Sequence, residues 1–419
     1  MERFGLDFGT TNSSLAWAQS NGQVVLCDLD GLAANARVLR SLLYFSPEKR
    51  DFVVGQRAIV EYLHEDMQGT LIQSIKTFLA DNSFEQTWIN DRFYKLEDLI
   101  AVIFQHVRQA IHRLTKDEAQ IVVGRPAVNV SRPEKEAIAQ ERLRKAAQLA
   151  GFFDVQYQYE PIAAGLAYEQ SLNAAQTVLI GDFGGGTSDF TVMRLGTGHG
   201  GDRREDILAS GGVQIAGDAF DARIMWHRLT KYFGAGSTYR TLKGETLPFP
   251  KALLAELGVW HHVPFLRNPK TREQLARLRW SCSKPRVIDA FESLIDGNYA
   301  FFLFQEIEKA KAELSTSDRT QICFRRAAID IDEPLSRRDF EEMIERDRAR
   351  IAECMDSVLA ASAVDPGRVD SVFLTGGSAQ IPAIRGLFVE RFGEGKLKSQ
   401  DYLTSVAVGL GLTAMQVFG

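Results

Sequence analysis

Apolar residues follow two alternating patterns along the chain: short runs typical of strands, and longer stretches with the spacing of an amphipathic helix. Residues 1–27 predict two or three strands around a glycine-rich turn. In 95–115 the apolar positions recur every three or four residues, which predicts a helix. Further strands are expected at 121–124, 155–159, 177–182, 189–195 and 372–374, and further helices at 132–151, 160–168 and 405–418, with another beginning near Asp218.

The order of these elements is more informative than any one of them. Strands alternate with helices, which favours an α/β fold, and the second half of the chain repeats the plan of the first. Residues 38–62 predict a strand-rich excursion and residues 250–315 a helical one. Residues 234–250 are the best loop candidate, and 196–204 predict a polar hairpin tip. We therefore expect two related halves with a ligand-binding cleft between them.

One short motif occurs twice. Gly5-Leu6-Asp7-Phe8-Gly9-Thr10-Thr11-Asn12-Ser13 returns in altered form as Ile180-Gly181-Asp182-Phe183-Gly184-Gly185-Gly186-Thr187-Ser188-Asp189. Each copy predicts a β-hairpin with a carboxylate at its mouth and small residues at its tip. Inward N–H groups of such a turn form an anion-binding nest, and glycine lets the backbone approach a ligand closely. Since a carboxylate repels a bare phosphate, the two copies predict a clamp for a metal-bound polyphosphate.

Composition and charge narrow the possible functions. The chain has 419 residues, 45% of them hydrophobic and 25% charged, with a formal net charge of −5, so electrostatics gives no reason to expect nucleic-acid binding. No apolar run approaches the roughly 20 residues of a membrane span, and the N-terminus enters a strand without room for a signal peptide. The four cysteines lack metal-binding spacing and suit a reduced, cytoplasmic protein.

Three familiar nucleotide-binding motifs fit the repeated Asp-Phe-Gly turn less well. A protein kinase needs a His-Arg-Asp catalytic loop, a P-loop ends in Gly-Lys-Ser/Thr, and a dinucleotide fold needs G-x-G-x-x-G; none of these patterns accompanies the two turns. Two ordinary tight hairpins would not require an Asp and three consecutive glycines. A third glycine site, Thr375-Gly376-Gly377-Ser378, follows a strand and precedes a helix beginning near Ile381, where close backbone approach suits an aromatic ligand or a phosphate.

The three glycine sites, in this order, resemble the nucleotide-binding domain of the DnaK-type heat-shock chaperones, within the actin/hexokinase superfamily. Three segments between them add to the resemblance: Tyr159–Ala164, Gly217–Asp221 and Ile307–Ser315. The resemblance covers nearly the whole chain and is nearest to a short, YegD-like branch with the nucleotide-binding domain only. It implies two ribonuclease H-like lobes around a nucleotide cleft. We expect lobe I at 1–170, with a small subdomain at about 36–95, and lobe II at 171–419, with a small subdomain at about 218–315.

The resemblance also implies roles for individual residues. Asp7 and Asp182 would hold hydrated Mg²⁺ and monovalent cations, of which K⁺ is a candidate, and Asp189 would complete the metal shell. Glu160 would order the attacking water together with Asp189. The phosphate oxygens of ATP or ADP would accept hydrogen bonds from Gly9, Thr10, Thr11, Asn12, Gly184, Gly185, Gly186 and Thr187. The expected catalytic set is Asp7, Thr10, Glu160 and Asp182.

The adenosine end of the nucleotide would be held by a separate set of residues. In Ile307–Ser315 the Glu-x-x-Lys-x-x-x-Ser spacing would place Glu308, Lys311 and Ser315 on one helix face. A solvated face with ion pairs three residues apart is the alternative for this segment taken alone. The remaining members of the expected adenosine site are Gly217, Gly376, Gly377 and Ser378.

Two departures from the family pattern bear on activity. In Val54-Gly55-Gln56-Arg57-Ala58-Ile59, we expect Ile59 to occupy the position of the family's catalytic lysine, and Lys76 to match a different, non-catalytic lysine; Arg57 and Lys76 remain candidates to reach the site. Without a cation at the phosphates, hydrolysis should be slow, because charge that develops in the transition state is left unbalanced.

The second departure concerns the rest of the chain. It stops at Gly419, so we expect no peptide-binding β-sandwich. Residues 237–305 match the family poorly. Their aromatic residues are expected to build a local core in preference to a partner surface: Phe249, Trp260, Phe265, Trp280, Phe291, Tyr299, Phe301, Phe302 and Phe304.

The sequence thus predicts a cytoplasmic, Mg²⁺-dependent, DnaK-like ATPase module that is slow and acts on a protein partner or co-chaperone. A nucleotide-sensing pseudo-ATPase scaffold is the alternative that the Ile59 assignment supports. A small-molecule kinase of the same superfamily is less favoured. No nucleic-acid or membrane partner is expected, and the sequence leaves the oligomeric state open.

Overall fold

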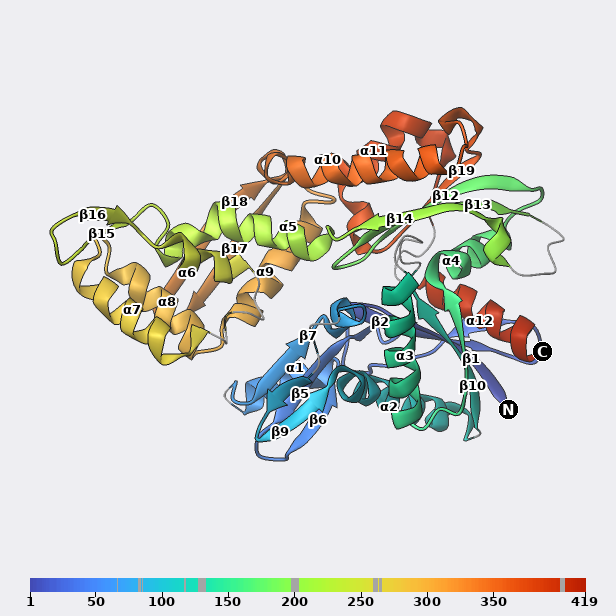
Figure 1. The fold of residues 1–419 in the computed structure, drawn as a ribbon, viewed down its shortest axis with the longest axis horizontal. Helices are drawn as coiled ribbons and strands as arrows, with labels where there is room; N and C mark the ends of the chain where they lie inside the picture. Colours follow the sequence, from blue (N-terminus) through green and yellow to red (C-terminus); the bar gives the residue numbers. More distant parts are fainter. Residues whose placement is uncertain are drawn as a thin grey trace. The chain divides into compact units, whose positions relative to one another are not determined.

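The computed structural model describes residues 1–65, 67–81, 84, 86–116, 118–126, 133–196, 203–258, 263, 266–399 and 404–419. Its contacts group the chain into two compact units (Figure 1). Unit 1 contains Met1–Ala216, Arg350–Gln380 and Ile384–Gly419, and unit 2 contains Gly217–Ala349 and Ile381–Ala383. This grouping differs from the two sequence halves, and the division into lobes at residue 170 stays a prediction.

Unit 1 holds two large sheets with the same strand order. The first runs β11-β10-β1-β2-β3, with β4 beside β2, and the second runs β14-β13-β12-β19-β20. In each, the first three strands form an antiparallel meander and the last two run parallel to the first strand. The strands are β1 (Glu2–Phe8), β2 (Asn12–Ala18), β3 (Val24–Leu26), β4 (Leu39–Arg40), β10 (Ala119–Arg125), β11 (Asp154–Tyr159), β12 (Gln176–Phe183), β13 (Ser188–Leu195), β14 (Ile207–Val213), β19 (Ser371–Thr375) and β20 (Leu397–Ser399). The repeated plan expected from the sequence is therefore confirmed.

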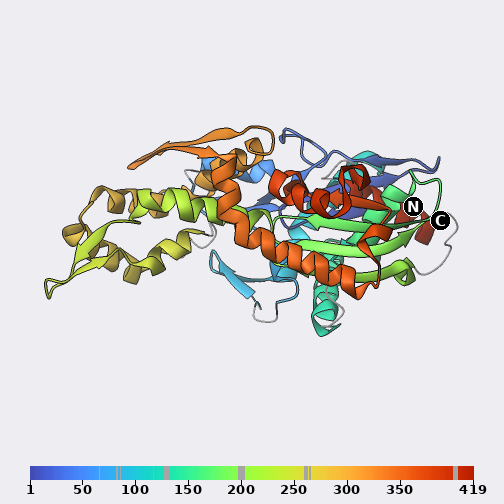
Figure 2. The same cartoon turned by 90° about the horizontal axis from the view of Figure 1, so that it is seen from above.

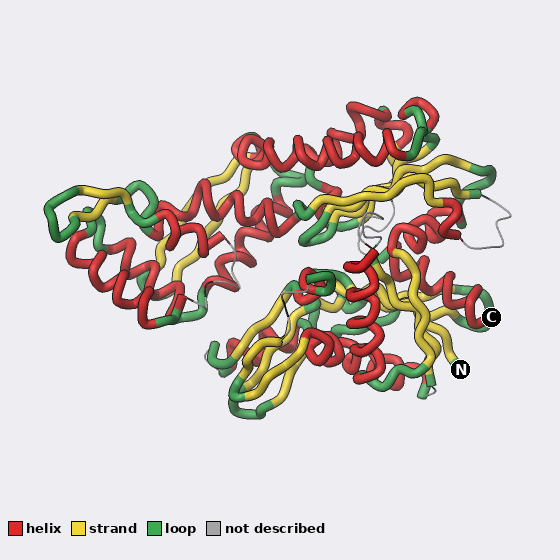
Figure 3. The backbone as a smooth tube through the Cα atoms, viewed as in Figure 1, coloured by secondary structure: helices red, strands yellow, loops and turns green. Residues whose placement is uncertain are grey.

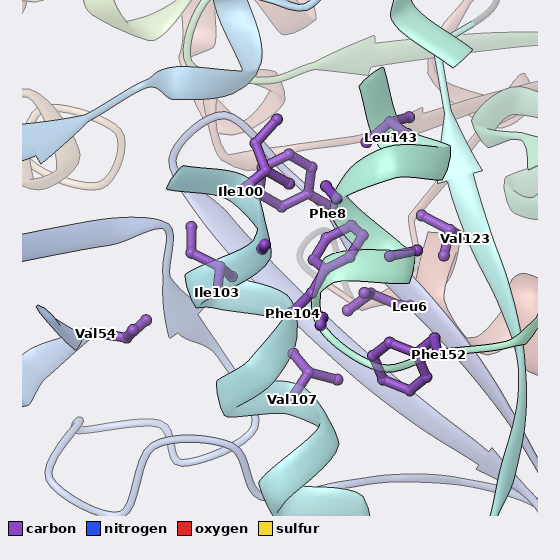
Figure 4. Packing of buried hydrophobic residues seen from close by; sticks show 14 of the residues in the cluster. Leu6, Phe8, Val54, Ile100, Ile103, Phe104, Val107, Val123, Leu143 and Phe152 are labelled. Atoms are coloured by element: carbon purple, nitrogen blue, oxygen red, sulfur yellow. The ribbon is translucent and has the colours of Figure 1, made fainter. Parts of the chain in front are cut away.

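A hydrophobic core covers one face of the first sheet. Helices α2 (Leu96–Thr115) and α3 (Pro133–Leu149) pack there. The apolar residues that recur every three or four positions in α2 are buried: Leu96, Leu99, Ile100, Ile103, Phe104, Val107 and Ile111. Figure 4 shows Ile100, Ile103, Phe104 and Val107 among them. Phe8 of β1 meets Phe104 of α2 edge to face, with ring centroids 5.4 Å apart. Burying such side chains contributes on the order of 2 kcal/mol each, so this face fixes the position of β1 and of the turn that follows it.

Two helices, α4 (Glu160–Glu169) and α12 (Ser405–Phe418), form a second core between the sheets. Helix α12 packs on β1, β2 and β10, while α4 contacts β12 and β13. Glycines allow these layers to approach closely: a Cβ atom on Gly409 would lie 1.7 Å from the Ala163 carbonyl oxygen, and one on Gly5 would lie 2.2 Å from the Gly411 nitrogen. Larger residues at these positions would separate the layers.

The outer face of the second sheet is covered by residues near the C-terminus. Phe388 of α11 (Pro382–Phe392) packs on Phe183 and Phe190, with centroids 5.8 and 6.3 Å away. Val358, near the end of α10 (Arg337–Ala361), lies against Gly211 of β14. Figure 2 shows these helices, orange to red, along the green strands.

A smaller group of elements follows β4. The sheet β6-β5-β7 and the hairpin β8–β9 belong to it, with helix α1 packed on β5 and β6. Their bounds are β5 (Leu42–Ser46), β6 (Asp51–Val54), α1 (Gln56–His64), β7 (Thr70–Gln73), β8 (Gln86–Ile89) and β9 (Arg92–Lys95). The strand-rich excursion predicted at 38–62 is confirmed for β4 to β6, whereas its last part is helical.

Unit 2 is mainly helical, with two hairpins (Figure 3). Its elements are α5 (Gly217–Ile224), β15 (Thr238–Arg240), β16 (Thr246–Pro248), α6 (Lys251–Ala255), α7 (Pro269–Ser281), α8 (Arg286–Asp296), α9 (Ala300–Glu313), β17 (Arg319–Arg326), β18 (Ile329–Ser336) and the first half of α10. The predicted loop at 234–250 is wrong in part, because β15 and β16 pair there. Most of the predicted hairpin tip at 196–204 lies outside the described residues.

Among the described residues, no helix is both long enough and apolar enough to cross a membrane.

Candidate functional site

The two hairpins of the repeated motif pair in the same register. Asp7 pairs with Ser14 across β1–β2, and Asp182 pairs with Asp189 across β12–β13. In each copy four residues separate the last pair of the ladder, which is Phe8 with Ser13 in the first and Phe183 with Ser188 in the second. At the first turn a Cβ atom on Gly9 would lie 2.0 Å from the Asn12 carbonyl oxygen, so glycine is needed there. The sequence repeat thus corresponds to a structural repeat with a carboxylate at each mouth.

The tips of the two hairpins lie near one another in unit 1. A Cβ atom on Gly186 would lie 3.9 Å from Cγ2 of Thr10 and 3.7 Å from Oγ1 of Thr77. Thr11 Oγ1 is buried and has no hydrogen-bond partner among the described residues. A buried hydroxyl without a partner is uncommon, because its desolvation goes uncompensated. This hydroxyl is therefore available to a ligand of the first turn.

Burial and neighbouring carboxylates raise the pKa values of three aspartates around the turns. Burial and then Glu160 raise the pKa of Asp7 to about 7, against the opposing effect of Lys76. Burial raises the pKa of Asp182 well above its usual value, with further contributions from Glu160, Asp189 and Asp7. The pKa of Asp189 rises to about 6, again mainly by burial, although the Thr187 hydroxyl donates to it at 2.7 Å. Such a concentration of carboxylates is typical of a site that receives a cation.

Glu160 sits where β11 ends and α4 begins, and its side chain is only 10% exposed. Gly124 of β10 leaves it room, since a Cβ atom there would lie 3.1 Å from Cγ of Glu160. A carboxylate in the first turn of a helix is stabilised by the helix dipole. Its place beside three aspartates, however, is not explained by helix stability.

Lys76 supplies the positive charge of this cluster. Its Nζ lies 2.7 Å from Oε1 of Glu160, and both side chains are about nine-tenths buried. Burial alone would lower the pKa of Lys76, but Glu160 and Asp7 raise it, so the lysine stays charged. A short 3₁₀ helix at Ile75–Phe78 presents it, and Ile75 anchors this turn in the core. We refer to Asp7, Lys76, Glu160, Asp182 and Asp189 as the charged cluster.

The position of Lys76 corrects the sequence assignment. Ile59 is 4% exposed on the inner face of α1, and Arg57 pairs with Glu61 at 2.8 Å with most of its side chain in solvent. Neither belongs to the charged cluster. The expectation that the site lacks its cation is therefore wrong. A signal was present in Ser74-Ile75-Lys76-Thr77-Phe78, where the lysine stands between the apolar residues Ile75 and Phe78.

A small cavity adjoins the cluster. It is lined by Pro126, Glu160, Pro161, Ile180, Asp182, Asp189 and Thr191 and has a volume of about 10 Å³. That is room for about one water molecule, and three carboxylates supply hydrogen-bond acceptors for it. The arrangement can hold a single water beside Glu160.

The third glycine site is built onto the second hairpin. Gly376 has φ of 84° and lies so close to β12 that a Cβ atom would be 2.1 Å from the Phe183 carbonyl oxygen. Ser378 donates to the Gly184 carbonyl at 3.3 Å. Nothing lies within 4 Å of a Cβ atom placed on Gly377. Gly376 is therefore a requirement of the fold, whereas Gly377 faces open space.

The remaining predicted adenosine residues belong to unit 2. Lys311 of α9 pairs with buried Asp221 at 2.7 Å and donates to the Gly217 carbonyl at 3.1 Å. Burial raises the pKa of Asp221 to about 7, which Lys311 opposes. The sequence did not single out this contact of Lys311. Helix α9 ends at Glu313, so Ser315 lies beyond it, contrary to the single helical face expected for Glu308, Lys311 and Ser315. That these residues and Gly376–Ser378 bind one adenosine stays a prediction.

Comparison with known proteins identifies the fold. The family model described as "Hsp70 protein" matches residues 3–238 and 296–417. The chain belongs to the Hsp70 protein family. The α/β architecture with two related sheets is that of the two-lobed, actin-like ATPase fold of Hsp70, as the sequence resemblance predicted.

Among curated relatives, the chain is similar to "Chaperone protein DnaK" from two strains of Thermus thermophilus. Each is 24% identical over 437 aligned positions, which cover 99% of this Hsp70-family chain. The chain spans about three fifths of the length of these relatives, since the alignments cover 61% of each. Residues 239–295 are outside the match to the family model.

Proposed function

We propose that this Hsp70-family chain binds ATP with Mg²⁺ at the two hairpin turns and hydrolyses it. The observation that carries the proposal is the charged cluster, in which Lys76 lies among four carboxylates beside the two glycine-rich turns. Phosphoryl transfer requires mostly positioning and neutralisation of charge, and the cluster offers both.

Each residue has a role that its surroundings support. Thr10, Thr11 and the backbone N–H groups of Gly185–Thr187 donate to phosphate oxygens, with the hydroxyl of Thr11, which has no partner among the described residues, as the clearest donor. The N–H of Gly184, which the sequence also assigned to a phosphate, donates instead to the Thr187 carbonyl at 3.0 Å. Lys76 balances negative charge that develops on the transferred phosphoryl group. Glu160 accepts a hydrogen bond from the attacking water and orients it toward the phosphorus.

The donor set also fits Mg²⁺. Among the described residues, no three His, Cys, Asp or Glu side chains form a group that could hold a metal ion. Mg²⁺ usually keeps several waters and is held by one or two carboxylates together with the phosphates, so it would arrive with the nucleotide. Asp7, Asp182 and Asp189 would accept hydrogen bonds from those waters, and the ion would neutralise the phosphate charge that these carboxylates otherwise repel.

The sequence argument for slow hydrolysis depended on a missing cation. Since Lys76 belongs to the charged cluster, that argument no longer applies, and the pseudo-ATPase scaffold loses the feature that supported it. We propose an active ATPase whose nucleotide state acts on a protein partner or co-chaperone. We also propose that lobes 1–170 and 171–419 enclose the nucleotide and that the protein works in the cytoplasm, as family membership suggests.

The test is a comparison of Lys76 with Arg57 in single-turnover hydrolysis and calorimetric ATP binding. Lys76→Ala should slow hydrolysis by about 100-fold or more, as for loss of a donor to transition-state charge, while affinity changes far less. Lys76→Arg, which keeps the charge, separates catalysis from folding. Arg57→Ala is the matched control and should leave both quantities unchanged.

Two outcomes would contradict the proposal. If wild-type protein binds no Mg-ATP, the nucleotide function is wrong. If Lys76→Ala hydrolyses ATP at the wild-type rate while Arg57→Ala does not, the corrected assignment of the cation is wrong.

A further inference from the structure

The segment that the family model leaves out differs in charge from the rest of the chain. Residues 239–295 contain ten Lys or Arg and five Asp or Glu, a formal charge of +5, although the whole chain has −5. The remaining residues therefore carry −10. A basic segment on an otherwise acidic protein favours contact with an acidic partner at that place.

Hydrogen bonds join two parts of this segment's exposed surface. Hairpin β15–β16 is fixed to the connection between α7 and α8, because Tyr239 forms a β-bridge with Cys282 and the Ser283 nitrogen donates to the Thr238 carbonyl at 2.7 Å. Trp280 lies in the last turn of α7, only two residues before that bridge. The hairpin and the end of α7 that carries Trp280 are thus held together within unit 2.

The sequence predicted that the aromatic residues of 237–305 build a local core, and Trp280 is an exception. Phe249, Phe291, Phe301 and Phe304 are buried as expected, whereas Trp260 and Phe265 lie outside the described residues. Trp280, in contrast, is 90% exposed, and Leu242 at the hairpin tip is fully exposed. Leaving a tryptophan in water forgoes one of the largest gains in apolar burial that a side chain offers.

Basic residues lie on both segments that meet at the Tyr239–Cys282 bridge. Arg240, Lys243, Lys284 and Arg286 are exposed and form no ion pair with the described residues. Arg277 is paired only with Glu273, one helical turn away and mostly in solvent, where such a pair contributes little. We name Arg240, Leu242, Lys243, Trp280, Lys284 and Arg286 the Trp280 surface.

We propose that the Trp280 surface binds an acidic segment of a partner protein, with an apolar residue of that segment against Trp280. Tryptophan and arginine are the residue types that contribute most at protein interfaces, and unpaired cations around an apolar centre complement alternating acidic and apolar residues. A nucleic acid fits less well, because its phosphates would continue past this limited patch over a protein that otherwise carries −10. The proposal does not depend on nucleotide binding.

The experiment uses the full chain and a labelled short peptide of alternating Glu and Leu, followed by fluorescence anisotropy. The same peptide with Gln in place of Glu, and a single-stranded DNA oligonucleotide, serve as competing probes. We expect the Glu–Leu peptide to bind and the Gln–Leu peptide to bind at least about tenfold more weakly, with affinity falling as salt rises.

Variants locate the binding. Trp280→Ala and the double variant R240E/K284E should each lower the affinity for the Glu–Leu peptide by about tenfold or more. Trp88→Ala is the matched aromatic control, since Trp88 is 56% exposed on the β8–β9 hairpin of unit 1, and Arg37→Glu is the matched charge control. Both controls should bind as wild type does. All of these side chains are exposed, so thermal unfolding should change little and shows that each variant is folded.

Several results would overturn the proposal: no peptide binding, equal binding by Trp280→Ala and wild type, or preferential binding of the DNA. Sedimentation velocity tests whether a second copy of the chain, in place of an acidic peptide, occupies the Trp280 surface. Self-association that Trp280→Ala abolishes, without peptide binding, would assign the surface to a second copy of the chain instead.

Discussion

The hairpins β1–β2 and β12–β13 share strand order, turn length and the register of their aspartates, yet they differ in what they offer a ligand. The first turn carries side-chain donors, Thr10, Thr11 and Asn12, whereas the second has three consecutive glycines and contributes mainly backbone N–H groups. Opposite Asp7 stands Ser14, but opposite Asp182 stands a second carboxylate, Asp189. The two copies therefore differ, with hydroxyl and amide side chains at the first turn and an additional carboxylate at the second.

This difference has an electrostatic consequence. Like charges meet mainly at the second hairpin, where Glu160, Asp189 and Asp7 all raise the pKa of Asp182 in addition to its burial. Lys76 offsets part of this repulsion at both hairpins, so the excess of carboxylates at the second remains. A bound cation would thus be needed more at the second hairpin, and the following predictions test whether the two hairpins differ in this way.

The largest effect is expected for Asp182→Asn. Hydrolysis in a single turnover should fall by about 100-fold or more, because a carboxylate that helps to hold the metal waters is lost, while ATP affinity changes by a few-fold. Without nucleotide the same variant should melt at a higher temperature than wild type, since Asn removes repulsion from three neighbours. Equal loss of binding and hydrolysis would instead indicate a binding role for Asp182.

Converting the first hairpin to the charge pattern of the second should be next in size. Ser14 is 1% exposed, so Ser14→Asp places an additional buried carboxylate opposite Asp7. We expect a loss of about 2–3 kcal/mol in the free energy of unfolding at neutral pH, measured by denaturant titration. Ser14→Ala is the steric control and should cost less. A Ser14→Asp protein as stable as wild type would show that the first hairpin tolerates the second carboxylate.

The pH dependence of stability follows from the raised pKa values. Asp7 and Asp189 have folded-state pKa values of about 7 and about 6, above the ordinary value of 3.8. Between these limits the folded protein binds protons that the unfolded chain releases, so the stability they contribute is present below about pH 4 and is lost as pH rises toward 7. The melting temperature without nucleotide should therefore fall over that range, and Asp189→Asn should reduce the slope. A slope that Asp7→Asn and Asp189→Asn leave unchanged would contradict this origin.

The smallest effect concerns the threonines of the two turns. Thr11→Val removes a buried hydroxyl that has no partner among the described residues, so the nucleotide-free protein should gain up to about 1 kcal/mol of stability while ATP affinity falls several-fold. Thr187→Val removes the hydroxyl that donates to Asp189 and should further raise the pKa of that carboxyl, with no gain in stability. Calorimetric titration and thermal unfolding of both variants measure the contrast; identical behaviour would mean that the turns are equivalent.

Local sequence signals predicted much of the architecture. The helices at 96–115 and 405–418 and the repeated hairpins came from periodicity and glycine placement, because each is specified by its own residues. Predictions failed where distant segments decide the outcome. Within an expected loop, β15 pairs with β16, and Tyr239 of β15 also bridges to the distant Cys282. Helix α9 ends before Ser315. The catalytic roles assigned to residues at the turns remain predictions until the variants above are measured.

Two Asp-led turns and a third glycine site after them can be read from the order of residues alone. Packing decided which positively charged side chain lies among the carboxylates near these turns. Ile59 and Lys76 are 17 positions apart, and the sequence around each does not show which other residues it contacts in the fold. The amphipathic helix α1 buries Ile59, while the turn at Ile75–Phe78 directs Lys76 onto Glu160. A short sequence motif specifies only the spacing of residues along the chain. Two opposite charges offset each other only when they lie close in space. The packing of helices and 3₁₀ turns against the sheet sets that distance.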